Sequence, residues 1–123
     1  MAINALLTDD TTVITSKMME LTTERQRIVA NNKANANTPG YIRLELNFQK
    51  KLTDIVKSGD MNELNGFSGK AVADAKDAVN SEGNNVVIPK EMNEMAQNSV
   101  FYNLLTKAFT TKLSILKAAI RTP

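Results

Sequence analysis

The sequence contains no cysteine, no histidine and no tryptophan. Without cysteine there is no disulfide, no thiol nucleophile and no thiolate metal ligand. Without histidine the chain also lacks the commonest metal ligand and the side chain best suited to proton transfer near neutral pH. Catalysis would have to use carboxylates, lysines or hydroxyl groups. We therefore expect a protein that is not an enzyme and has neither a metal nor another cofactor.

Aromatic residues are scarce, at 5% of the chain, although hydrophobic residues make up 42%. This composition is typical of a folded protein, but it does not predict a large self-contained core. A chain of 123 residues fits one modest domain, or one extended element that completes its core with neighbouring copies.

Neither sign of charge dominates, because 15 Lys and Arg residues stand against 13 Asp and Glu residues, for a net charge of +2. Such a chain has no strong field to attract nucleic acid. A nucleic-acid module would have to use basic residues that alternate with acids and have no aromatic surface beside them. These residues are Arg25, Arg27, Arg43, Lys50 and Lys51. We expect no nucleic-acid partner.

Long apolar runs are also missing. A run such as Val86 to Ile88 is far shorter than the roughly 20 residues that cross a bilayer, so we expect no direct membrane insertion. Residues 1–9 lack the basic start of a secretory signal and lead directly into acidic residues. We expect them to be a disordered N-terminal segment without a cleaved leader.

A heptad pattern predicts a helix over residues 10–37. Asp9 or Asp10 can cap its first turn, and Pro39 disfavours helical geometry at Thr38, so the helix ends before that residue. Its apolar residues recur at steps of four, three and seven, which indicates one narrow apolar face. We call this face the N-terminal stripe: Ile14, Met18, Leu21 and Ile28.

Residues 38–88 predict a turn, a short helix and a flexible loop. Pro39 and Gly40 suit the second and third positions of a type II turn, which needs a positive φ at the third. Residues 41–60 first alternate apolar with polar and then adopt helical spacing, which favours an extended piece followed by a short helix. Glycine-rich residues 59–85 indicate a loop, in which residues 71–80 allow a marginal helix or a short strand pair.

A second heptad pattern predicts a helix over residues 89–121. Pro89 is tolerated in the first turn, and basic residues near the other end complement the helix dipole. We call its apolar face the C-terminal stripe: Met92, Met95, Tyr102, Phe109, Leu113, Leu116 and Ile120.

Two narrow stripes predict a mainly α protein, in which the two long terminal helices pair as an antiparallel coiled coil around a short irregular or β-containing middle segment. Val29, Leu104, Leu105 and Ile115 lie outside the stripes and leave apolar surface for other copies of the chain. A monomeric helical bundle closed by the middle segment is the alternative.

One run of the sequence is unusually rich in asparagine, and we call residues 30–41 the Asn-rich motif. Asparagine is a mediocre helix former, so these amides either cap the helix or bond a facing element. The motif includes Asn31, Asn32, Asn35, Thr38, Pro39, Gly40 and Tyr41.

The Asn-rich motif closely resembles the signature of the flagellar axial proteins, the rod, hook and junction family, over twelve consecutive positions. A second stretch is similar to the GNNV segment before the C-terminal helix of proximal rod proteins; it comprises Gly83, Asn84, Asn85 and Val86. Lys33 departs from the family pattern, in which an apolar residue is usual, and residues 60–82 are not covered by the resemblance.

The resemblance implies a structural subunit of the proximal rod of the bacterial flagellar basal body, which polymerises through its terminal helices and transmits torque. It implies a periplasmic location and export by the flagellar type III apparatus without a cleaved signal peptide. The partners it implies are other copies of the chain, other proximal rod proteins, and the rod adaptor and export gate at the membrane ring.

The charged residues also allow other interpretations. Glu91 and Glu94 lie one helical turn apart, like a pair of catalytic carboxylates, but no apolar cleft frames them, so we expect a solvated face. The pairs Asp9–Asp10 and Lys50–Lys51 are expected to be surface charge. A soluble helical secreted effector or export-associated chaperone is the alternative function, since it would share helix pairing but not the Asn-rich motif.

Overall fold

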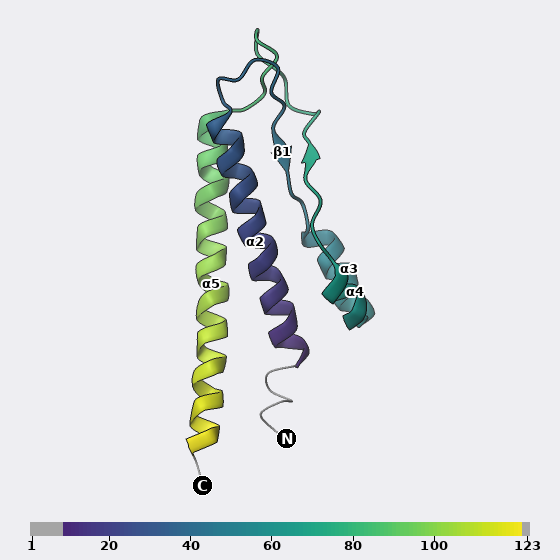
Figure 1. The fold of residues 1–123 in the computed structure, drawn as a ribbon, viewed down its shortest axis with the longest axis vertical. Helices are drawn as coiled ribbons and strands as arrows, with labels where there is room; N and C mark the ends of the chain where they lie inside the picture. The colour runs from purple at the N-terminus through teal and green to yellow at the C-terminus, as the bar shows by residue number, and fades with distance from the viewer. Residues whose placement is uncertain (1–8, 122–123) are drawn as a thin grey trace.

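The computed structural model describes residues 9–121, which form two long helices joined by a folded middle segment (Figure 1). Helix α2 and helix α5 lie side by side and run in opposite directions (Figure 1). The middle segment returns along the other side of α2. The elements in chain order are α2 (Asp10–Ala34), β1 (Leu44–Glu45), α3 (Gln49–Ser58), α4 (Met61–Gly66), β2 (Val72–Ala73) and α5 (Ile88–Arg121). The mainly α class and the antiparallel pairing of the terminal helices are thus confirmed.

Helix α2 begins and ends through local side-chain chemistry. The backbone amide of Thr12 donates to Asp9 Oδ1 at 2.9 Å, so Asp9 is the N-cap. At the other end, the Asn35 backbone amide donates to the carbonyl oxygens of Asn31 and Asn32, each at 3.1 Å. The regular helix therefore stops at Ala34, within the predicted range, and residues 35–37 continue as turns.

The middle segment is more ordered than its composition predicts. The predicted extended piece and short helix correspond to β1 and α3, and β1 pairs antiparallel with β2, with Leu44 opposite Ala73. Helix α4 lies where the glycine-rich composition of residues 59–85 predicts a loop. Its local signal is the pair Asp60 and Glu63: the Glu63 amide donates to Asp60 Oδ1 at 3.1 Å, as at the start of a capped helix.

The main apolar core lies between α2 and the middle segment. Its buried residues are Leu21, Ile28, Leu46, Phe48, Leu52, Ile55 and Leu64, with Ile14 and Met18 packed against them. Gly69 belongs to this packing, because a Cβ there would lie 2.5 Å from Leu46 Cδ1. Among the described residues, no side chain of α5 is part of this cluster. The N-terminal stripe therefore packs on the middle segment, and no residue of the C-terminal stripe belongs to this cluster.

Helices α2 and α5 meet through a different face of α2, which is more polar. Thr22 and Val29 are buried there, and the Asn98 amide of α5 donates to the Thr22 carbonyl oxygen at 2.9 Å. Lys112 of α5 pairs with Asp9 beside the first turn of α2. The end of α5 extends past the start of α2 (Figure 1). No helix within residues 9–121 is long and apolar enough to cross a membrane.

Candidate subunit-contact surface and the buried polar cluster

The predicted turn at the end of the Asn-rich motif is present. The Tyr41 amide donates to the Thr38 carbonyl oxygen at 3.2 Å, which closes a four-residue turn. Gly40 has a φ of +74°, the positive value that a type II turn needs at its third position. A turn is therefore present where the sequence predicts one, and that it needs glycine at position 40 stays a prediction.

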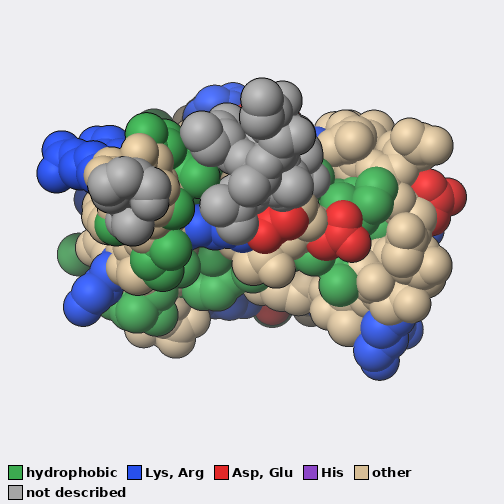
Figure 2. Space-filling model, turned by 90° about the horizontal axis from the view of Figure 1, so that it is seen from below, with side chains coloured by type: hydrophobic (Ala, Val, Ile, Leu, Met, Phe, Trp, Pro, Cys, Tyr) green, Lys and Arg blue, Asp and Glu red, His purple; other side chains and the backbone are tan. Residues whose placement is uncertain are grey.

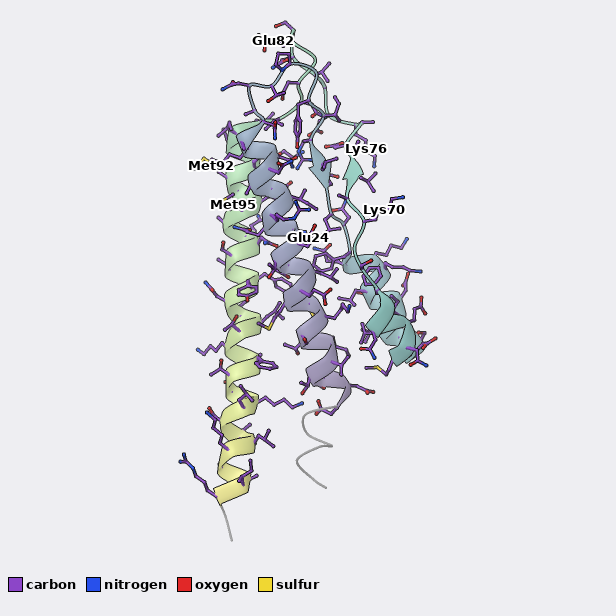
Figure 3. The ribbon with its side chains drawn as sticks, viewed as in Figure 1. Glu24, Lys70, Lys76, Glu82, Met92 and Met95 are labelled. Carbon is purple, nitrogen blue, oxygen red and sulfur yellow. The ribbon has the colours of Figure 1, made fainter. Side chains whose placement is uncertain are left out.

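The Asn-rich motif and the GNNV segment contact one another, which the sequence alone did not reveal. Asn84 Nδ2 donates to the carbonyl oxygens of Asn35 at 2.9 Å and Thr38 at 2.8 Å. The Gly40 amide donates to the Glu82 carbonyl oxygen at 2.8 Å. Glu82 lies in the loop beyond the paired helices (Figure 3). The two motifs therefore form one joint that fixes how the chain leaves α2 and enters α5.

Asn32 holds β1 against α2 by imitating a neighbouring strand. Its side chain is fully buried; Nδ2 donates to the Leu44 carbonyl oxygen at 2.8 Å, and Oδ1 accepts from the Leu44 amide at 2.9 Å. The same Oδ1 accepts from the Tyr41 hydroxyl, and Nδ2 also reaches Glu91 Oε2 at 3.3 Å. Of the two expectations for these asparagines, bonding to a facing element applies to Asn32. Asn35 instead bonds the carbonyl oxygen of Asn31 in its own helix.

Arg43 lies at the centre of a buried ion cluster between β1, the loop after β2, and α5. Its side chain has no exposed surface, and its Nε donates to Glu91 Oε1 at 2.5 Å. Nη1 donates to Asp74 Oδ2 at 2.8 Å, and Nη2 to Glu94 Oε2 at 3.1 Å. We call the whole set the Arg43 cluster: Arg43, Glu45, Asp74, Glu91 and Glu94.

The Arg43 cluster places four carboxylates around one guanidinium, so negative charge is in excess. Burial opposes the charged form of Arg43, but its hydrogen bonds to Glu91, Glu45 and Asp74 raise its pKa further above the usual value. Burial also raises the pKa of Glu94. For Asp74, burial acts in the same upward direction, yet the hydrogen bond from Arg43 and backbone amides leave the pKa below its usual value. Arg43 thus stays charged, and four carboxylates share its one guanidinium.

The expectation that Glu91 and Glu94 form a solvated face is wrong, because Glu91 is fully buried and both bind Arg43. Arg43, one of the basic residues considered for nucleic acid, is likewise unavailable to a partner. Charge spacing within a helix could not reveal these contacts, since Arg43 lies 48 residues before Glu91. Within residues 9–121, no group of acidic side chains has the arrangement that holds a metal ion.

The other charged pairs have individual roles. Asp9 caps α2 and pairs with Lys112, whose hydrogen bond, together with those from Thr12, lowers the Asp9 pKa to about 2. Lys51 lies 3.8 Å from Glu63, an exposed contact of little energetic weight. Asp10 and Lys50 are exposed.

The C-terminal stripe is only partly covered by α2. Leu116 is buried, and Met95, Phe109 and Leu113 are half-buried. Met92, Tyr102 and Ile120 are exposed by 52%, 36% and 57%, and Met92 extends away from α2 (Figure 3). The buried residues of α5 are Glu91, Asn98, Leu105 and Leu116, and only Leu116 belongs to the C-terminal stripe. The apolar pattern missed this face because polar side chains form much of it.

A further apolar face of α5 is largely exposed. Val100, Leu104 and Ile115 are exposed by 60%, 61% and 62%. We call this face the outer stripe: Val100, Leu104, Ala108, Thr111 and Ile115, at steps of four, four, three and four. Figure 2 shows hydrophobic side chains gathered around the end of α5. An apolar cavity of ≈ 310 Å³ lies along this region, lined partly by Ala108 and Ile115.

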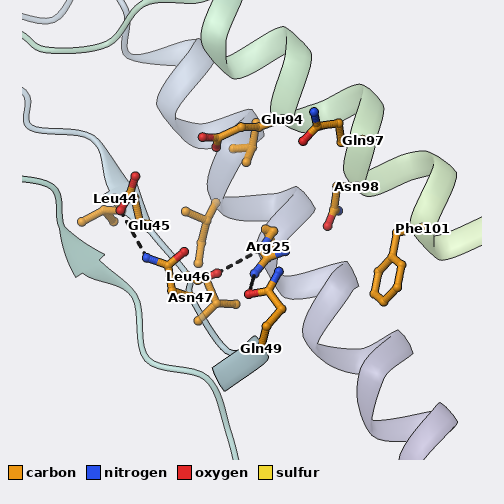
Figure 4. A pocket seen from close by; sticks show the side chains of 12 residues that line it. Arg25, Leu44, Glu45, Leu46, Asn47, Gln49, Glu94, Gln97, Asn98 and Phe101 are labelled. Atoms are coloured by element: carbon orange, nitrogen blue, oxygen red, sulfur yellow. Dashed lines mark hydrogen bonds between the residues drawn. The ribbon is translucent and has the colours of Figure 1, made fainter. Parts of the chain in front are cut away.

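A groove opens where α2, α5 and the segment after β1 converge (Figure 4). We call it the α2–α5 groove; it has a volume of ≈ 380 Å³ and an apolar floor that includes Ile28 and Leu46. Arg25 closes one side, donating to the Leu46 carbonyl oxygen and to Gln49 while its guanidinium stacks 4.2 Å from the centre of the Phe48 ring. Its other lining residues include Glu45, Glu94, Gln97, Asn98 and Phe101.

Comparisons with known proteins match the sequence of this chain to flagellar rod proteins. The family model described as flagella basal body rod protein matches residues 19–41, which contain the Asn-rich motif. The chain is 31% identical over 98 residues to the flagellar basal body rod protein FlgB of Buchnera aphidicola, covering 68% of this chain and 74% of that protein. It is 29% identical over 106 residues to FlgB of Bacillus subtilis, covering 78% and 81%. It is 28% identical over 108 residues to FlgB of Borreliella burgdorferi, covering 73% and 80%.

Proposed function

Because the chain belongs to the FlgB family of flagellar basal body rod proteins and is a structural subunit of the rod, we propose that it polymerises through its two terminal helices and works without catalysis. Its partners in this proposal are other copies of itself, other proximal rod proteins, and the rod adaptor and export gate at the membrane ring. It reaches the periplasm by flagellar export without a cleaved signal peptide. The proposed export segment, residues 1–9, lies outside the described residues except for Asp9.

The observation that carries the proposal is the uncovered apolar surface of α5. The outer stripe and the exposed members of the C-terminal stripe lie on a helix that is already paired with α2, and within residues 9–121 no other element covers them; in this proposal another subunit does. Exposed apolar residues that share one helix face are typical of protein–protein contact sites. The N-terminal stripe supports assembly indirectly, because its packing on the middle segment makes α2 a rigid support for α5.

Torque transmission requires a subunit that does not bend where the middle segment meets the helices. The joint between the Asn-rich motif and the GNNV segment, together with the Arg43 cluster, links α2, β1 and α5 through buried polar contacts. Buried networks of this kind rigidify a fold when every member is satisfied. In this proposal the motif residues are structural, and none is catalytic.

The alternative of a secreted effector or export-associated chaperone is not favoured. It would account for helix pairing, but it would not account for the Asn-rich motif. It would also not account for a match to rod proteins that extends over most of their length.

The proposal is tested by replacing the chromosomal copy of the gene in the bacterium that carries it. The full-length chain should restore swimming to a deletion strain and should be recovered in purified basal bodies. Leu104→Asp should be lost from basal bodies, because a carboxylate buried in an apolar contact costs several kcal/mol. Asn103→Asp, at the neighbouring exposed position, is the matched control and should assemble normally. Normal swimming without the gene would refute the proposal.

A further inference from the structure

Asn98 has a buried acceptor that the described part of the chain leaves unsatisfied. The residue is 4% exposed, and its Nδ2 donates to the Thr22 carbonyl oxygen and to Gln26 Oε1. Among the described residues, nothing donates to its Oδ1. Because a buried polar atom without a partner costs about 1–3 kcal/mol, the site favours an incoming hydrogen-bond donor. Asn98 lines the α2–α5 groove, where it lies between Gln97 and Phe101 (Figure 4).

The charge at the mouth of the groove adds a second requirement. Glu45 and Glu94 line the groove, and their side chains remain 31% and 34% exposed although both contact Arg43. Arg43 is shared among four carboxylates, and Arg25, which also lines the groove and interacts with Glu94, adds one further cation, so negative charge remains in excess. With an apolar floor formed by Ile28 and Leu46, the groove suits a partner that is apolar, basic and able to donate a hydrogen bond.

The second half of α5 has this chemistry. Between Met95 and Arg121 there is no acidic residue, and the basic residues are Lys107, Lys112, Lys117 and Arg121. The outer stripe in this half carries a hydroxyl donor at Thr111, and the exposed Lys107 lies on the same side of the helix. Lys112 is already paired with Asp9, whereas Lys107 has no acidic neighbour on its own helix.

From this complementarity we infer that the α2–α5 groove of one subunit receives the outer stripe of α5 from a second copy of the chain, with Lys107 beside Glu45 and Glu94. The inference rests on the proposed rod function and names the partner of the uncovered helix face. The two surfaces lie on different parts of the chain, so each copy offers a groove to one neighbour and a stripe to another. Such a heterologous contact extends into a ring or a helical filament instead of closing at a dimer.

The chain contains no cysteine, so disulfide cross-links can form only between cysteines that are introduced into it. The test uses the full-length chain carrying both Gln97→Cys and Thr111→Cys, as the only copy in flagellated cells treated with a mild oxidant. Both positions are exposed. We expect a ladder of cross-linked dimers, trimers and larger species that contain this chain alone, whereas each single-cysteine chain should give no ladder.

Charge exchange provides an independent readout. Gln97→Lys in the groove and Lys107→Glu on the stripe should each reduce the chain recovered in basal bodies about tenfold, since like charges across an interface are strongly unfavourable. The two changes together should restore recovery, because the charges are then complementary again. Lys50→Glu, on exposed α3, is the control and should have no effect.

The outcomes separate this inference from the function on which it rests. Cross-linked dimers only, cross-links only to a different rod protein, or no restoration by the charge exchange would overturn the groove contact while leaving the rod function intact. Absence of the unaltered chain from basal bodies would overturn both.

Discussion

At the scale of single residues, side chains of the Asn-rich motif form hydrogen bonds to backbone groups. The Asn32 side chain forms the two hydrogen bonds to the Leu44 backbone that a neighbouring strand would form. Asn84 donates to two carbonyl oxygens of the turns after α2. These are demands that helix ends and strand edges make on any chain. The motif is therefore explained by the geometry of the joint, and it needs no ligand.

Gly40 is the residue at which a backbone change should be felt most directly. Gly40→Val should destabilise the fold by about 1–2 kcal/mol, because a β-branched residue is strained at a φ of +74°. The strain is conformational, since nothing lies within 4 Å of a Cβ at this position. Urea unfolding followed by circular dichroism measures the change.

The matched control for Gly40 is Gly66→Val, another glycine with open space around a Cβ but without a positive φ. It should unfold at the same urea concentration as the unaltered chain or at a higher one, since valine favours helix more than glycine does. Equal stability of the two variants would remove the positive φ from the account of the turn.

Arg43 should be the most sensitive side chain in the molecule. Arg43→Met should cost about 3–5 kcal/mol of unfolding free energy, because it leaves four carboxylates without their shared cation. Denaturant unfolding gives the value, and loss of a cooperative transition would be the extreme result.

Arg27→Met is the comparison for Arg43, since Arg27 also pairs with a glutamate but is 68% exposed. It should change stability by less than about 1 kcal/mol. A similarly small effect of Arg43→Met would show that the Arg43 cluster does not hold the middle segment to α5.

At the scale of elements, the ends of α2 and α5 are linked by one ion pair. Lys112 and Thr12 hold the Asp9 pKa at about 2, below its ordinary value of 3.8. A carboxylate whose pKa is depressed in the folded state contributes stability above its unfolded pKa, and this contribution is lost as the pH falls through the folded pKa. The link between α2 and the second half of α5 should therefore weaken between about pH 4 and pH 2.

This pH dependence is measured as the thermal midpoint of unfolding between pH 5 and pH 2. Asp9→Asn keeps a capping side chain but removes the charge, so its midpoint should fall less over this interval than that of the unaltered chain. Asp10→Asn is the control, since Asp10 is exposed and adjacent. Identical pH profiles for Asp9→Asn and the unaltered chain would contradict the role of the ion pair.

At the scale of the whole molecule, α5 is longer than the helix that covers it. Phe109 and Leu113 lie near the point at which α2 begins and line the apolar cavity there. Phe109→Asp or Leu113→Asp should prevent assembly and swimming, because a carboxylate placed in an apolar contact costs several kcal/mol. Motility in soft agar and the chain content of basal bodies are the measurements.

Ser114→Asp is the control for these two variants, because Ser114 is an exposed polar residue beside Leu113. It should support normal swimming. If Phe109→Asp and Leu113→Asp also swim normally, the C-terminal stripe is not part of a subunit contact.

The amino-acid sequence by itself determined the local structure. Heptad spacing placed both long helices to within a few residues, Pro39 ended the first, and Gly40 required the turn. It also identified the family, because the Asn-rich motif is a contiguous run of residues. Features of this kind depend on neighbours within a few positions, so a linear reading can find them.

Only the tertiary structure decided which faces meet. The N-terminal stripe packs on α3 and α4, and α5 buries Asn98 and Leu105 instead of Met92 and Tyr102. The Arg43 cluster joins residues up to 51 positions apart. Apolar periodicity depends only on where hydrophobic side chains occur, so it does not predict the contacts of a buried amide or of a shared guanidinium. The physical reason is that long-range polar contacts leave no periodic trace in the sequence.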